Sequence, residues 1–160
     1  MRWWRRRQLL KAIRKGNLFM VEDLLRKGID ANIEDDEGFP ALILAVLKGR
    51  ADIVLALADK GAELDARDRN DGTAIMYAAL YGNAAMVDGL ADRGADINLN
   101  DGDQGTALMF AASGGHLDAV DSLLKRGAEK SARDSQQETA LSLAVAGEHS
   151  AVVDRLQEEV

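Results

Sequence analysis

The chain has 160 residues, of which 47% are hydrophobic and 29% charged, and its formal net charge at pH 7 is −7. It contains no cysteine, which excludes disulfide bonds, thiolate catalysis and cysteine metal sites. No apolar run reaches the roughly 18 residues that a membrane-spanning helix requires, and the N-terminal sequence lacks the apolar stretch of a signal peptide. We therefore expect a single acidic, cytoplasmic domain.

The charge is distributed unevenly along the chain. Residues 1–15 contain seven basic residues and no acidic one, so residues 16–160 must carry −14 for the total to be −7. We interpret residues 1–8 as a basic, tryptophan-containing N-terminal arm that precedes the regular part of the chain. The arm includes Trp3, Trp4, Arg5, Arg6 and Arg7.

Three interpretations of this arm remain open. Its residues can form a solvated outer face of the first helix pair, with the tryptophans covering an apolar edge. They can instead contact an anionic membrane surface, nucleic acid or an acidic partner, because arginine beside tryptophan suits all three. Self-association is the third interpretation. The acidic remainder of the chain would repel a polyanion, which confines nucleic-acid binding to the arm.

From residue 9 to residue 157 the chain repeats every 33 residues without an insertion. Threonine, alanine, valine and leucine each recur at this interval. A period of this length is typical of a solenoid of stacked helical hairpins. The equivalent positions are Pro40, Thr73, Thr106 and Thr139; Ala12, Ala45, Ala78, Ala111 and Ala144; Val21, Val54, Val87, Val120 and Val153; and Leu24, Leu57, Leu90, Leu123 and Leu156.

Each repeat is predicted to form a helix, a turn, a second helix and a hairpin loop. Thr73 and Thr106 precede apolar runs, and threonine is a good N-cap. Glycine follows both helices, because it readily adopts the left-handed conformation at a helix C-terminus. Stretches rich in Asp and Asn then reverse the chain. The glycines are Gly49, Gly82 and Gly115 after the first helix, and Gly28, Gly61, Gly94 and Gly127 after the second.

Two of the repeats closely resemble the ankyrin repeat. Their sequences are DGTAIMYAALYGNAAMVDGLADRGADINLND and QGTALMFAASGGHLDAVDSLLKRGAEKSARD, and the family pattern includes a G-x-T-P-L-H-x-A-A start and a G-A-D-x-N loop. The resemblance covers residues 9–160. It implies an all-α ankyrin-repeat solenoid of stacked helix-turn-helix units joined by hairpin loops, which serves as a scaffold for binding and not for catalysis.

The chain departs from the ankyrin pattern at two positions. Alanine replaces the proline of the family, at Ala41, Ala74, Ala107 and Ala140. The family histidine, which links repeats through hydrogen bonds, is also replaced, and we expect apolar packing to substitute for that polar link. The residues at the histidine position are Ile43, Met76, Met109 and Ser142.

The repeat boundaries predict a short array with a cap at each end. Lys11 and Gln157 stand where most other repeats have apolar residues, and Glu148 replaces the turn glycine, as expected where no further repeat docks. The predicted units are an N-terminal cap at 9–35, internal repeats at 36–68, 69–101 and 102–134, and a C-terminal cap at 135–160.

The sequence offers little support for catalysis. Its two histidines, His116 and His149, are also 33 residues apart, so we interpret both as structural residues at the start of a second helix. Ser113, His116 and Asp118 are the residue types of a catalytic triad, but their places in the repeat explain each of them. We predict no enzyme activity, no cofactor and no metal site.

The resemblance places the binding surface in a concave groove between the hairpin tips and the first helices. Apolar residues at variable positions form its expected centre and charged residues its rim, as in most interfaces. For Phe39 and Leu80, packing between repeats is a competing interpretation, whereas Leu47 and Tyr81 lie beside a turn glycine and are harder to bury. The predicted site comprises Asp36, Glu37, Phe39, Leu47, Lys48, Arg69, Asn70, Leu80, Tyr81, Asp103 and Ser113.

The sequence thus favours a monomeric, non-catalytic module that binds a partner protein through its groove. In one alternative, the repeats are a spacer and the basic arm recruits the protein to an anionic membrane or to nucleic acid. A second alternative is an engineered ankyrin binder, which would present the same groove.

Overall fold

The computed structural model describes residues 2–158, with only the backbone of Arg2 and Trp3. These residues form ten α-helices and no strand beyond two isolated β-bridges, so the predicted all-α class is confirmed. The helices are α1 (Arg2–Arg14), α2 (Leu18–Arg26), α3 (Ala41–Leu47), α4 (Ala51–Asp59), α5 (Ala74–Leu80), α6 (Ala84–Ala91), α7 (Ala107–Ser113), α8 (Leu117–Lys125), α9 (Ala140–Ala146) and α10 (Ser150–Gln157).

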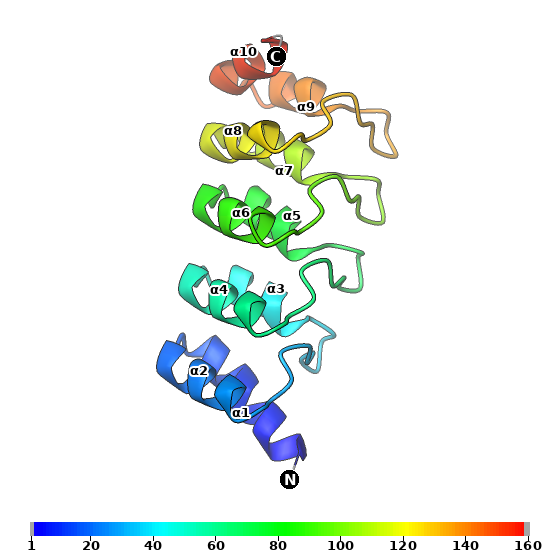
Figure 1. Ribbon diagram of the computed structural model, residues 1–160. Helices are drawn as coiled ribbons and strands as arrows, with labels where there is room; N and C mark the ends of the chain where they lie inside the picture. The colour runs from blue at the N-terminus through cyan, green and yellow to red at the C-terminus, as the bar shows by residue number, and fades with distance from the viewer. Residues whose placement is uncertain (1, 159–160) are drawn as a thin grey trace.

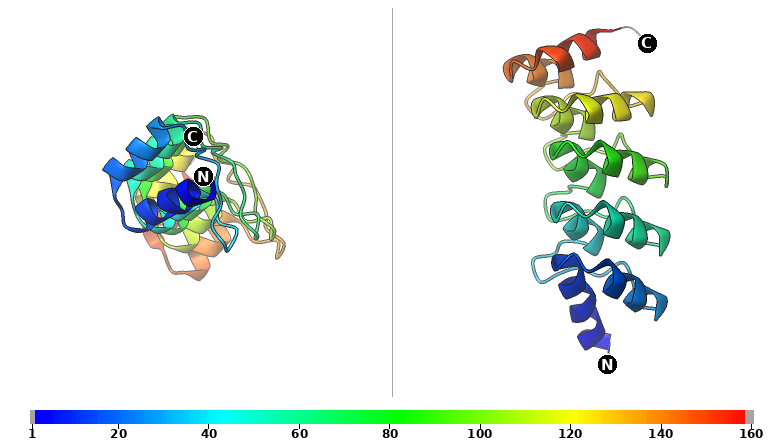
Figure 2. Two further views of the ribbon diagram at one scale, coloured as in Figure 1. Left: turned by 90° about the horizontal axis from the view of Figure 1, so that it is seen from below. Right: turned by 90° about the vertical axis from the view of Figure 1, so that its left-hand side faces the viewer.

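The five helix pairs stack into an elongated solenoid with two layers (Figure 1). The first helices of the pairs, from α1 to α9, pack against one another, and the second helices, from α2 to α10, do the same. The loops that join one pair to the next extend from the same side of the stack, next to the layer of first helices (Figure 1). The N-terminal end of α1 tilts away from the stack, as the right-hand view of Figure 2 shows.

The core follows the 33-residue period. The recurring alanine is buried in every repeat, which allows neighbouring first helices to approach closely, and the recurring leucine is buried as well. Helix α3 is short and apolar along almost its whole length, because neighbours on both sides and its own partner α4 cover it. The second helices bury only one side, with Val21, Val54, Val87 and Val120 completely enclosed. The predicted register of the repeats is therefore confirmed.

Helix termini agree with the predicted caps except at one position. Thr106 accepts a hydrogen bond from the amide of Met109, and Thr139 forms a reciprocal capping box with Ser142. Thr73 occupies the same place, but its hydroxyl makes no such bond. Its Oγ1 atom is buried and has no hydrogen-bond partner within residues 2–158.

The turn glycines adopt the left-handed conformation that the sequence predicts. Because Gly82 and Gly115 have no side chain, they also leave space for the histidine ring of the next repeat. A Cβ atom at Gly82 would lie 2.5 Å from Nδ1 of His116, and one at Gly115 would lie 2.5 Å from Nδ1 of His149. Glu148, at the equivalent position in the last repeat, has a φ of 58° and so keeps the left-handed turn without glycine.

Polar links between repeats are present, contrary to the expectation that apolar packing alone would replace them. His116 Nε2 lies 3.0 Å from the carbonyl oxygen of Leu80, and His149 Nε2 lies 2.9 Å from that of Ser113. Since each ring joins the start of a second helix to the preceding repeat, both histidines are structural, as predicted. In this chain the polar link between repeats is therefore made by a residue at the start of the second helix, and not by a histidine in the first helix.

Arginines form a further series of links along the second helices. Arg93 pairs with Asp59 at 2.7 Å, Arg126 pairs with Asp88 at 2.7 Å and with Asp92 at 2.8 Å, and Arg155 pairs with Asp121 at 2.5 Å. Partly exposed pairs of this kind contribute little individually. Their recurrence on one side of the solenoid reinforces the order in which the repeats stack.

The ends of the solenoid differ from its middle. Lys11 and Gln157 are exposed, whereas Leu44 and Leu124, which occupy the equivalent positions in internal repeats, are buried and half-buried, respectively. Residues 2–8 belong to the same continuous helix, α1, as residues 9–14, so the basic segment is helical and not a detached arm. The division of the chain into arm, caps and internal repeats remains a proposal. Among residues 2–158, no helix is both long and apolar enough to cross a membrane.

Candidate functional site

The candidate site is the surface formed by the hairpin tips and the C-terminal ends of α3, α5 and α7, which we call the groove. The tips carry most of the predicted polar residues, and the helix ends carry most of the apolar ones. Nine of the predicted residues are exposed, while Phe39 and Leu47 are half-buried. The tip residues are Asp36, Glu37, Phe39, Arg69, Asn70 and Asp103, and the helix-end residues are Leu47, Lys48, Leu80, Tyr81 and Ser113.

An aspartate organises each hairpin tip. Asp68 Oδ1 accepts hydrogen bonds from the amides of Asn70 and Gly72, at 2.9 and 3.0 Å. Such Asx turns hold a loop in one conformation without regular secondary structure. The sequence prediction did not include these residues, although they recur at the same interval of 33. The four aspartates are Asp35, Asp68, Asp101 and Asp134.

Tyr77 connects the second tip to the helix behind it. Its hydroxyl donates a hydrogen bond to Asp68 Oδ2 at 2.5 Å, and the carboxylate is almost completely buried. Burial raises the pKa of Tyr77, and the hydrogen bond to the negatively charged Asp68 raises it further. The tyrosine therefore stays protonated and keeps the tip fixed to α5.

A hollow of about 390 Å³ lies between the ends of α3 and α5. Leu47 and Lys48 form one side and Tyr81 the other, while Met86 of α6 forms part of the lining. Tyr81 is 61% exposed, so its ring has no intramolecular cover comparable to that of a core residue. The structure therefore brings together three of the predicted residues in a concave, partly apolar site.

A second hollow of about 270 Å³ lies one repeat further along, between α5 and α7. Leu80, which is 39% exposed, lines it together with Tyr77 and Phe110, and the tip residues Asn70 and Asp103 border it. Tyr77 and Phe110 were not among the predicted site residues, because the repeat pattern marks their positions as core. Their half-buried side chains serve both as packing and as a wall of this hollow.

Phe39 lies outside both hollows and packs against the core. The equivalent residues are Gly72 and Gly105, where a Cβ atom would lie 3.0 Å from the ring of Tyr77 and 3.3 Å from the ring of Phe110. In the repeat of Phe39 the corresponding helix position holds Leu44, so a ring before the helix replaces a ring within it. Packing against the core is therefore the role that the structure supports for Phe39.

The remaining predicted residues line neither hollow. Arg69 lies across the first tip, with Nε 2.9 Å from the place of a Cβ atom at Gly38. Asp36 and Glu37 are exposed on that tip. Ser113 is exposed at the end of α7, and its carbonyl is the partner of His149. These four residues are exposed polar groups on the tips and helix ends of the groove.

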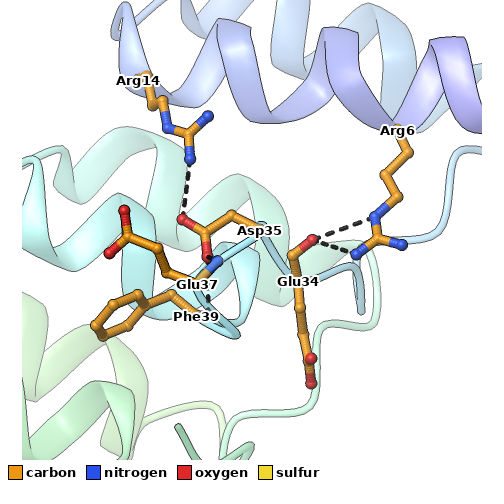
Figure 3. Close-up of polar contacts among 6 residues, drawn as sticks. All are labelled: Arg6, Arg14, Glu34, Asp35, Glu37 and Phe39. Carbon is orange, nitrogen blue, oxygen red and sulfur yellow. Dashed lines mark hydrogen bonds and ion pairs between the residues drawn. The ribbon is translucent and has the colours of Figure 1, made fainter. Parts of the chain in front are cut away.

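Helix α1 is attached to the first hairpin by two arginines (Figure 3). Arg6 donates two hydrogen bonds to the carbonyl oxygen of Glu34, at 2.6 and 3.2 Å, and Arg14 pairs with Asp35 at 3.0 Å. Both side chains point from α1 toward the loop that precedes α3 (Figure 3). Trp4 is 59% exposed. The side chain of Trp3 lies outside the described part of the chain.

The geometry gives no support to a catalytic triad. His116 contacts the carbonyl of Leu80, and the Ser113 carbonyl contacts His149, so these contacts do not form the serine–histidine–aspartate relay of a triad. No group of three or more potential metal ligands occurs within residues 2–158.

Two family models match the chain. The model for ankyrin repeats (3 copies) covers residues 9–101, and the model for ankyrin repeats (many copies) covers residues 90–144. The chain belongs to the ankyrin repeat family. A comparison with curated proteins finds no match. Ankyrin repeats are generally protein–protein interaction modules and typically have no enzymatic activity. Their general role leaves the partner of this ankyrin repeat protein to be inferred from its own surface.

Proposed function

We propose that this ankyrin repeat protein is a non-catalytic module that binds a segment of a partner protein in the groove. The observation that supports the proposal most strongly is the pair Leu80 and Tyr81 at the end of α5. They are consecutive and exposed, and each lines a different hollow, Tyr81 facing Leu47 and Leu80 facing Phe110. Two partly apolar sites one repeat apart suit a partner segment that carries two apolar side chains.

The margin of the groove indicates how the partner is oriented. Lys48 borders the first hollow, and Asn70 and Asp103 border the second. Polar groups placed beside apolar anchors fix register and suppress wrong partners more than they add affinity. Because the Asx turns hold the tips in place, little ordering of the loops is needed on binding. We further propose that the module is monomeric and acts in the cytoplasm, where its lack of cysteine is compatible with a reducing environment.

The proposal is tested with Leu47→Ala combined with Tyr81→Ala. Partners are first captured from the source cell with the wild-type protein, and the affinity of one purified partner is then measured by calorimetry. We expect the double variant to bind at least about thirtyfold more weakly, which corresponds to the roughly 2 kcal/mol of an interface hot spot. Its circular dichroism spectrum should remain that of the wild type, because neither side chain is fully buried.

A matched control lies on the opposite layer. Asp118 and Lys125 of α8 are exposed, and neither forms an ion pair with another residue in the described range 2–158. Asp118→Ala combined with Lys125→Ala should leave the affinity unchanged. If this control abolished binding while the groove variant kept full affinity, the binding surface would be the layer of second helices instead.

A further inference from the structure

We propose that the outer side of α1 binds acidic side chains of the partner segment, at the N-terminal end of the groove. This inference rests on the proposed function, since it assigns a chemistry to one end of the same partner. A hollow of about 610 Å³ lies on this side of the helix. Its lining, which we call the basic face, consists of Trp4, Arg7, Gln8, Lys11, Arg14 and Lys15.

The helical spacing explains why these residues share one side. Positions 4, 7, 8, 11, 14 and 15 are three or four apart, so their side chains project in similar directions. The opposite side of α1 holds the buried residues Leu9, Ala12 and Ile13. Helix α1 is therefore amphipathic, with an apolar side in the core and a cationic side that no other helix within residues 2–158 covers.

The basic face continues the groove. Arg14 and Lys15 are one repeat before Leu47 and Lys48, and two repeats before Leu80 and Tyr81. The same two repeat positions therefore line the partly apolar hollow between α3 and α5 and the cationic hollow on α1. A segment that lies along the groove and extends to α1 meets apolar contacts first and positive charge next.

The charge of this face is not neutralised within α1. Residues 1–15 contain no acidic residue, and the first in the chain is Glu22. Arg14 is partly neutralised by Asp35, but its side chain remains 46% exposed. Lys11 and Lys15 are exposed and form no ion pair with any residue from 2 to 158. Because Arg6 and Arg14 fix α1 to the first hairpin, the cations are held in place before a ligand arrives.

The surroundings favour acidic side chains of a protein over a longer polyanion. Asp36 and Glu37 are exposed on the neighbouring tip, and residues 16–160 carry a net charge of −14. A nucleic acid or an anionic membrane would extend its charge over this acidic surface and be repelled there. A protein segment can place its acidic residues on α1 and apolar residues in the groove.

The tryptophans provide a built-in probe, because both of them, Trp3 and Trp4, are in α1. We would titrate the protein with a hexaglutamate peptide and follow tryptophan emission, with hexaglutamine as the uncharged control. The test variant is Lys11→Gln combined with Lys15→Gln. Its matched control is Lys60→Gln combined with Lys125→Gln, which changes the net charge equally on exposed residues at the ends of α4 and α8.

We expect a saturable, salt-sensitive change in emission with hexaglutamate and none with hexaglutamine. The Lys11/Lys15 variant should bind roughly tenfold more weakly, as two partly screened charge contacts predict, while the Lys60/Lys125 control should stay close to wild type. Equal responses to both peptides, or equal losses in both variants, would overturn the inference. So would phosphatidylserine vesicles that bind in a Lys11- and Lys15-dependent manner while hexaglutamate does not.

The two proposals fail in different ways. If hexaglutamate does not bind but a captured partner still depends on Leu47 and Tyr81, the α1 inference is wrong and the groove proposal stands. If a partner depends on Lys11 and Lys15 but not on Leu47 and Tyr81, the groove proposal is wrong, and α1 alone is the binding surface.

Discussion

The inner face of each repeat, by which we mean the buried residues that contact the neighbouring repeats, differs from the groove face in how its residue types vary along the chain. Both faces are built from the same 33-residue unit. On the inner face the residue type recurs, as with Leu57, Leu90 and Leu123, all completely buried. On the groove face it changes from repeat to repeat, so that Arg14, Leu47, Leu80 and Ser113 occupy one equivalent position. Recurrence marks positions that every repeat needs for stacking. Variation marks positions that are free to specify a partner.

The largest effect is expected on the inner face. Leu90→Ala removes a completely buried side chain in the middle of the solenoid and should lower the free energy of unfolding by about 2–5 kcal/mol. Gln157→Ala, at an exposed end position, should change it by less than about 0.5 kcal/mol. Urea denaturation measures both. Equal and mild effects would show that inner and outer positions have been assigned incorrectly.

A smaller loss of stability is expected when the glycine in the turn between the two helices of a repeat is replaced by alanine. Gly49 and Gly82 have the same left-handed φ of 68°, but only at Gly82 would an added Cβ atom have a neighbour, the His116 ring, within 4 Å. Gly49→Ala should cost about 1 kcal/mol from backbone strain alone. Gly82→Ala should cost about 1 kcal/mol more, because the displaced ring loses its hydrogen bond to Leu80.

Thermal or urea denaturation of the two glycine variants gives the difference directly. The His116→Ala background provides the control, since the extra cost of Gly82→Ala should vanish there. If Gly49→Ala and Gly82→Ala lowered the free energy of unfolding of the otherwise wild-type protein equally, the His116 ring would not stabilise the junction between these repeats.

An effect of about 1 kcal/mol is expected for Tyr77→Phe, which removes the hydroxyl bound to Asp68. The raised pKa of Tyr77 adds a pH dependence. The stabilisation by the hydrogen bond between Tyr77 and Asp68 is complete below the pKa of tyrosine in the unfolded state, about 10. It is lost as the pH rises from there toward the higher pKa of Tyr77 in the folded state. Denaturation between about pH 9 and 11 should show a shallower decline for Tyr77→Phe than for wild type; parallel curves would contradict the predicted ionisation.

The smallest expected effect is a stabilisation, whereas Leu90→Ala, the two glycine variants and Tyr77→Phe are all expected to lower the free energy of unfolding. Glu148 keeps a left-handed φ of 58° at a position where the other four repeats have glycine. Glu148→Gly should therefore raise the melting temperature, with a stabilisation of up to about 1 kcal/mol. A decrease would show that the glutamate side chain contributes more than its backbone strain costs.

The period of the sequence predicted the fold because recurrence is a property of the inner face, which the structure confirms at Ala78 and Leu90. It did not predict that Tyr77 and Phe110 line a hollow, because half-buried residues follow the same pattern as core residues. It also missed Asp35 and Asp68, whose role depends on loop geometry. The sequence identified His116 as structural, but it did not predict a polar link between repeats at that residue. Apolar packing was expected instead, since Ile43, Met76 and Met109 occupy the position of the family histidine.

The basic segment illustrates the same limit. Its charge was visible in the sequence, but a count of charges cannot show whether the residues form a separate arm or a helix. The structure places residues 2–8 in α1 and connects Arg6 to the backbone of the first hairpin. A charged surface that is fixed to the groove can contribute to binding in one defined register, which a detached arm cannot.

The central claim is that the groove face holds the partner, and amide hydrogen exchange of the wild-type protein with and without a captured partner tests it most directly. We predict slower exchange in the complex at the tips, residues 35–40, 68–73 and 101–106, and at the ends of α3 and α5. Exchange in α4, α6 and α8 should change little. Protection confined to those second helices, with unchanged exchange at the tips, would contradict the claim.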